Sequence, residues 1–81
     1  MLSSNEIALK LKELTELALY YKEYRANLKS WFYDNHKTMT EKKIKKMIEE
    51  IQKTSELIAS VESEKKSILL LQEYVTKISA Y

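Results

Sequence analysis

The stretch DNHKTMTE, residues 34–41, interrupts an otherwise helical apolar pattern and decides how the chain folds. Its last four residues, TMTE, read as a capping box that begins at Thr38, while Met39 and Ile44 would form a hydrophobic staple around a cap at Thr40. Asp34 and Asn35 suit a turn, because they tolerate the left-handed backbone conformation better than other non-glycine residues. A turn over residues 34–39 is short, so the helices on either side are expected to be antiparallel neighbours.

The composition points to helices throughout. The 81 residues include no glycine and no proline. Tight β-turns depend on glycine, whereas helices need neither residue. The charged fraction of 32% is typical of amphipathic helices with solvated outer faces. We therefore predict an all-α fold with a single helical domain over residues 1–81.

The first helix is predicted over about residues 3–33. Ser3 and Glu6 occupy the two ends of a capping box, which places the helix start at residue 3 or 4. From Ile7 onward, apolar residues recur with the helical period, and no breaker interrupts them before Asp34.

The second helix is predicted over about residues 40–81. Apolar residues repeat roughly every 3.5 positions from Ile44 to the C-terminus. A break near residues 60–63 is the alternative, because Ser63 could cap a third helix, although no capping box surrounds it. The two interpretations are a long antiparallel helical hairpin and a three-helix bundle.

The apolar side of the first helix is too wide for one neighbour. On a helical projection it spans about 200°, whereas a helix on a single packing surface needs little more than about 100°. Folding the chain about His36 also leaves apolar residues between Leu71 and Tyr81 beyond the end of the first helix. We therefore expect a homodimer in which two hairpins form a four-helix bundle or coiled coil. The residues expected at this or another protein interface are Tyr20, Tyr24, Arg25, Trp31, Tyr33, Leu71, Tyr74, Val75 and Ile78.

The sequence offers little for catalysis or metal binding. It has no cysteine, and His36 is its only histidine, which excludes a Cys/His metal site. The Glu-x-x-His pattern of di-iron bundles is absent as well. Arg25 lies inside the apolar arc, where we expect it to fix the register through an ion pair or to bind a partner. We predict that the chain has no enzymatic activity and no cofactor.

Lysines gather around the turn and the start of the second helix. Residues 34–48 carry a net charge of +3, and the rest of the chain carries −1. Such a cluster could contact phosphate or an acidic protein surface, although its lysines are spread around the helix. The candidates for anion or nucleic-acid contact are Lys37, Lys42, Lys43, Lys45 and Lys46.

The sequence is most consistent with a non-enzymatic helical protein–protein interaction module. We expect it to self-associate and to bind a larger protein as a small adaptor, inhibitor or immunity-type protein. A nucleic-acid-binding regulator that uses residues 37–46 is the alternative. Thirteen lysines against one arginine suggest a low-GC host or its phage. No apolar run approaches the roughly 20 residues of a membrane span, and no signal peptide is evident, so we expect a cytoplasmic protein.

Overall fold

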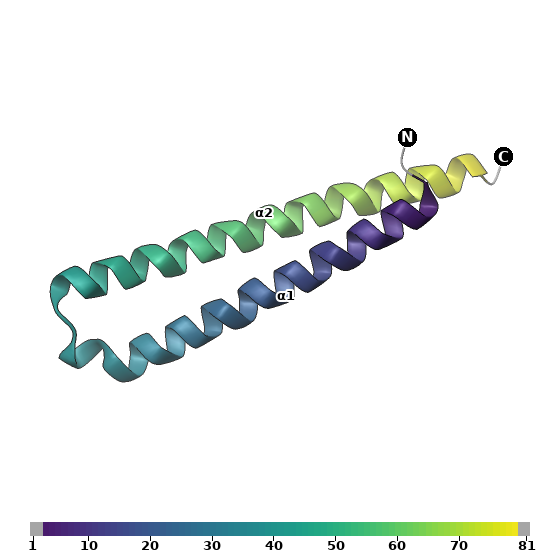
Figure 1. Ribbon diagram of the computed structural model, residues 1–81. Coiled ribbons are helices and arrows are strands. Elements are labelled where there is room, and N and C mark those ends of the chain that lie inside the picture. Colours follow the sequence, from purple (N-terminus) through teal and green to yellow (C-terminus); the bar gives the residue numbers. More distant parts are fainter. Residues whose placement is uncertain (1–2, 80–81) are drawn as a thin grey trace.

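The computed structural model describes residues 3–79 and shows a helical hairpin. The chain forms a long helix α1 (Ser4–Asn35), a 3-10 turn η1 (His36–Thr38) and a second long helix α2 (Glu41–Ser79). The two long helices run antiparallel and are joined by η1 at one end (Figure 1). No strand occurs within the described residues. The predicted all-α hairpin is therefore confirmed, while Tyr81 and the last predicted residues of the second helix lie outside the described part.

Both long helices start at side-chain caps. The backbone N–H of Glu6 donates to the Ser3 hydroxyl oxygen at 3.2 Å, and α1 begins directly after Ser3. The backbone N–H of Lys43 donates in the same way to Thr40 Oγ1 at 3.3 Å, and α2 begins directly after Thr40. Each cap satisfies an amide in the first turn that has no partner within its helix.

The turn forms without a left-handed residue, contrary to what Asp34 and Asn35 led us to expect. No residue in the described part has a positive φ, and Asn35 has φ −116° and ψ −10°. Helix α1 instead continues to Asn35, whose side-chain amide donates to the Trp31 carbonyl oxygen at 2.8 Å. His36 Nδ1 lies 2.8 Å from the Tyr33 carbonyl oxygen, which can only accept, so this nitrogen carries the proton. Side-chain bonds to the last carbonyls of α1 therefore replace the glycine that many helix ends use.

Helix α2 is continuous, so the three-helix alternative is wrong. It runs from Glu41 to Ser79 without interruption at residues 60–63. Ser67 donates its hydroxyl to the Ser63 carbonyl oxygen at 3.2 Å. Hydroxyls in this helix therefore bond to the preceding turn, a pattern that leaves the helix intact.

The hairpin is a rod rather than a globule. It measures 63 × 15 × 14 Å, and its radius of gyration is 18.2 Å. A compact domain of this length would have a radius of gyration of about 12 Å. Two helices side by side leave most of each helix surface outside the shared seam.

The seam follows an alternating spacing of three and four residues, as in an antiparallel coiled coil. The seam residues of α1 are Ile7, Leu11, Leu14, Ala18, Tyr21, Arg25, Leu28, Phe32 and Asn35. Those of α2 include Ile44, Met47, Ile51, Thr54, Ile58, Val61, Lys65 and Ile68. Only a few of them are fully buried, namely Ile7, Leu14, Ala18, Thr54, Ile58 and Val61. The core of a single chain is therefore small.

Candidate interaction surface

The hairpin has two long flanks, one on each side of the seam, and its polar contacts fix which residues face each other. On one flank Lys10 forms an ion pair with Glu64 at 3.6 Å, and the Tyr24 hydroxyl donates to Glu50 at 3.3 Å. Both pairs follow one antiparallel register, which also places Leu17 opposite Leu57 and Trp31 opposite Lys43.

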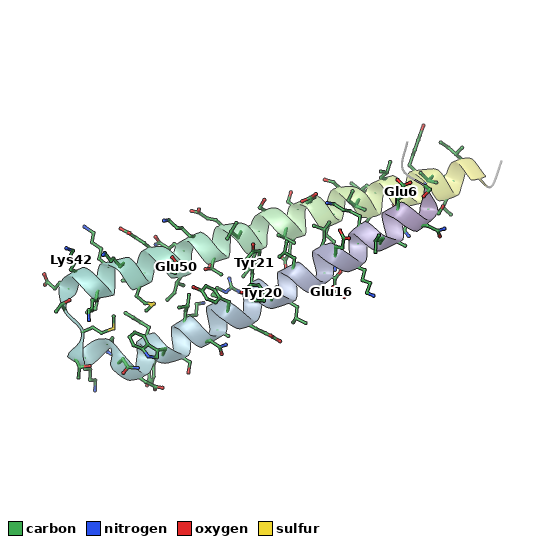
Figure 2. All side chains as sticks on the ribbon, in the orientation of Figure 1. Glu6, Glu16, Tyr20, Tyr21, Lys42 and Glu50 are labelled. Atoms are coloured by element: carbon green, nitrogen blue, oxygen red, sulfur yellow. The ribbon has the colours of Figure 1, made fainter. Side chains whose placement is uncertain are left out.

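We call this side the aromatic flank. It is formed by Leu17, Tyr20, Tyr24 and Trp31 of α1 and by Leu57 of α2. Three of its α1 residues recur every seventh position and so lie in a row along the helix. All five side chains are exposed in the single chain, with Tyr20 at 62% and Trp31 at 49%. The rings of Tyr20 and Tyr21 make an edge contact at 5.7 Å between centroids, near the middle of the hairpin (Figure 2).

The opposite side, the polar flank, is closed by charged and hydroxyl groups. Lys22 and Glu62 form an ion pair across it at 2.6 Å. The hydrogen bond and the charge of Lys22 lower the pKa of the Glu62 carboxyl below its ordinary value. Two apolar side chains, Ile48 and Leu69, are also exposed here, but Ser55 and Glu62 separate them along α2. The polar flank therefore carries no continuous apolar row.

A groove lies on the aromatic flank next to the turn. Its apolar lining comes from Tyr24, Leu28 and Trp31 of α1 and from Met39 and Met47. Lys43, Lys46 and Glu50 line its edge, and its volume is about 470 Å³. We call it the turn groove. An open, mostly apolar groove with a few polar groups at its edge is typical of a surface that takes an apolar side chain from a partner.

Tyr24 stands between the turn groove and the middle of the flank. Partial desolvation, together with the neighbouring Glu50 carboxylate that its hydroxyl bonds, raises the pKa of Tyr24. The Tyr24 hydroxyl donates this bond across from α1 to α2. This contact ties the two helices together where the seam residues are only half-buried.

Several predicted interface residues lie at the far end of α2. The helix continues past the start of α1, as Figure 1 shows. We call residues 71–78 the overhang. Tyr74 is 59% exposed and Ile78 49%, while Leu71 and Val75 are half-buried. The overhang therefore presents apolar side chains that α1 does not cover.

Two other predicted interface residues lie away from the aromatic flank. Arg25 sits in the seam, where its Nη1 donates to the Ser55 hydroxyl oxygen at 3.1 Å. Its partner is a neutral hydroxyl rather than the carboxylate that we expected. Tyr33 lies on the outer side of α1, 78% exposed, beside the ring of His36 at 6.3 Å between centroids.

The five lysines predicted to contact an anion or nucleic acid are all exposed, namely Lys37, Lys42, Lys43, Lys45 and Lys46. Lys43 and Lys46 border the turn groove, and Lys42 lies at the start of α2 (Figure 2). Within residues 3–79, none of the five forms an ion pair, because both ion pairs there involve other lysines. Within the described residues, the positive charge of these lysines is therefore not neutralised by ion pairs.

Five apolar residues of this surface were not among the sequence-based candidates, namely Leu17, Leu28, Met39, Met47 and Leu57. Leu57 could have been found from the register, because it lies seven residues from both Glu50 and Glu64 on α2. The two methionines contribute to the turn groove because the helices do not close over them, and this depends on helix separation rather than on sequence spacing.

The described part of the chain contains no group of three or more His, Asp or Glu side chains arranged to hold a metal ion. Neither long helix, as far as residues 3–79 describe them, is both long and apolar enough to cross a membrane. The sequence matches no protein-family model, and comparisons with curated proteins and with solved structures gave no significant match.

Proposed function

We propose that the chain is a non-enzymatic helical module for protein–protein interaction, which self-associates and binds a larger protein. The observation that carries this proposal is the row of exposed large apolar side chains on the aromatic flank. The aromatic flank presents five large apolar side chains and a groove, whereas on the polar flank Ser55 and Glu62 separate the exposed Ile48 from Leu69. An apolar row of this length on a small chain is typical of an interface.

The small core gives a second reason to expect association. A chain of this size usually needs disulfides, a metal or a partner for stability. Disulfides are excluded because the sequence has no cysteine. Among the residues that the structure describes, the buried apolar side chains are only Ile7, Leu14, Ala18, Ile58 and Val61. A partner that covers the aromatic flank would bury further apolar side chains and so stabilise the fold.

Contact with a larger protein needs a surface that self-association leaves free. Leu19 and Tyr33 lie fourteen residues apart on the outer side of α1, away from the aromatic flank, and are 58% and 78% exposed. An adaptor, an inhibitor or an immunity-type protein would use such outward side chains. The proposal includes that a phage or another mobile element encodes the chain and that the protein acts in the cytoplasm.

Site-specific photo-cross-linking in the producing cell tests this function. A photo-reactive phenylalanine is placed at Tyr24, at Tyr33 or, as a control, at exposed Ser30 on the same helix. We expect protein adducts from positions 24 and 33 and few from position 30. If positions 24 and 33 gave no more protein adducts than position 30, the chain would not be an interaction module.

The uncompensated lysines favour nucleic-acid binding as the second candidate. Lys37, Lys42, Lys43, Lys45 and Lys46 are exposed and free of ion pairs within the described residues. Binding through them would weaken steeply with salt, because each phosphate contact releases counterions. A titration with short DNA and RNA duplexes at two salt concentrations tests this function, and the absence of salt-dependent binding would dismiss it.

A further inference from the structure

We infer that the aromatic flank binds the same flank of a second copy in antiparallel orientation, so that the overhang of each chain covers the turn groove of the other. The inference rests on the proposed function and specifies its self-association. Three observations carry it, namely the exposed area, the distribution of charge and the matching positions of overhang and groove.

The accessible surface of the hairpin is larger than that of a compact monomer of the same mass. The accessible surface is 6640 Å² for 9.6 kDa. A compact monomer of this mass would expose about 5,100 Å². The excess of about 1,500 Å² exceeds the roughly 800 Å² that each partner buries in a standard interface. The elongated hairpin therefore exposes more extra surface than one partner buries in a standard dimer interface.

Charge selects the antiparallel orientation. Residues 20–57, the turn half of the hairpin, contain nine basic and six acidic side chains, a net charge of +3. The remaining residues, the open half, contain five basic and six acidic side chains, a net charge of −1. A parallel dimer would place the two positive turn halves together, whereas an antiparallel dimer separates them.

The helix dipole points to the same orientation. Four lysines, Lys42, Lys43, Lys45 and Lys46, lie in the first turns of α2, where the dipole disfavours positive charge. An antiparallel partner brings the negative end of its own α2 beside these lysines. The unfavourable local placement of the lysines thereby becomes a favourable contact between chains.

The positions of groove and overhang match for a two-fold axis at the middle of α2. That helix runs from Glu41 to Ser79, so its midpoint is Ser60. Lys46, at the turn groove, and Tyr74, in the overhang, each lie fourteen residues from Ser60. A two-fold axis there superposes the full lengths of both α2 helices and sets the Tyr74 ring of each copy over the groove of the other. Leu17 and Leu57 then lie close to the axis and pack against their symmetry mates.

Two measurements on the full chain test this arrangement. Sedimentation from micromolar to millimolar concentration gives the oligomeric state. Spin labels give the orientation, because the chain has no cysteine and Ser60→Cys or Lys46→Cys therefore carries a single label. The antiparallel dimer gives a label distance under about 20 Å for position 60 and about 40 Å for position 46. A parallel dimer gives short distances for both, and that result, like a monomer at all concentrations, overturns the inference.

A matched pair of tyrosine variants tests the contact itself. Tyr74→Ser removes the overhang ring and should raise the dimer Kd at least about tenfold. Tyr33→Ser removes a ring that is even more exposed, on the outer side of α1, and should change the dimer Kd less than about twofold. Equal effects of the two variants would contradict the arrangement. A monomeric chain that still cross-links to other proteins from position 33 would overturn this inference and leave the proposed function standing.

Discussion

The two halves of the hairpin are packed differently, although the same seam runs through both. In the open half, Ile7, Leu14, Ala18, Ile58 and Val61 are buried. In the turn half, residues 20–57, the only buried side chain is that of Thr54. The open half therefore holds the fold together, and the turn half presents the groove.

The size of the seam residues explains this difference. Ala18 is small and lets α1 approach α2 at Val61, where Leu14 completes a buried cluster. The turn half instead contains Tyr21, Arg25 and Phe32 in α1, and helix separation depends on the side chains at the contact. Leu28 and Met47 are only half-buried there and line the turn groove.

The difference in packing between the two halves predicts the largest loss of stability when a buried leucine of the open half is truncated. Leu14→Ala should lower the free energy of unfolding by about 2–5 kcal/mol, because it leaves a cavity in a buried cluster. Leu28→Ala, the same change in the turn half, should cost less because Leu28 is only half-buried. Urea unfolding at one fixed protein concentration measures both. Equal costs would show that the two halves are packed alike in solution.

Removal of a helix cap should have an intermediate effect at either end. Ser3→Ala deletes the acceptor for the Glu6 amide, and Thr40→Ala deletes the acceptor for the Lys43 amide. Each should lower the free energy of unfolding by about 1 kcal/mol. Hydrogen exchange locates the loss in the first turn of the affected helix. Loss of protection throughout the chain from Thr40→Ala alone would mean that the turn controls folding of both halves.

The sequence was sufficient for the fold and for most of the aromatic flank. Capping residues and the spacing of apolar residues determine both helix starts, and the same spacing places Tyr20, Tyr24 and Trp31 in a row. The continuity of α2 was left open, because Ser63 could act as a cap or bond within the helix. The turn groove could not be predicted, since it depends on helix separation, and separation reflects all the seam side chains together.

Substitution of Arg25, in the turn half, should change the free energy of unfolding less than the loss of a helix cap. Its guanidinium is half-buried in the seam and bonds the neutral Ser55 hydroxyl at 3.1 Å. Arg25→Met removes a charge from a partly desolvated place and keeps apolar volume. We expect the free energy of unfolding to change by less than about 1 kcal/mol, and Ser55→Ala serves as the control. A loss above about 2 kcal/mol would mean that this bond fixes the register of the turn half.

The smallest expected effect is the pH dependence from the polar flank. Lys22 lowers the pKa of Glu62 on folding, so the folded chain holds this carboxyl deprotonated more strongly than the unfolded chain does. The resulting stability is present above the ordinary glutamate pKa and is lost as pH falls through the lowered value. Because both groups are exposed, the contribution is screened by solvent and should be slight.

Carbon-13 NMR titration of the Glu62 carboxyl checks this directly. Lys22→Met should move its pKa back toward the ordinary value, since the hydrogen bond and the charge are both lost. Lys29→Met, on the same flank but without an ion pair in residues 3–79, should leave it in place. If Lys29→Met moved the pKa of Glu62 as far as Lys22→Met did, the overall positive charge of the turn half would be the cause of the lowered pKa. The polar flank would then be held by overall charge rather than by a specific pair between Lys22 and Glu62.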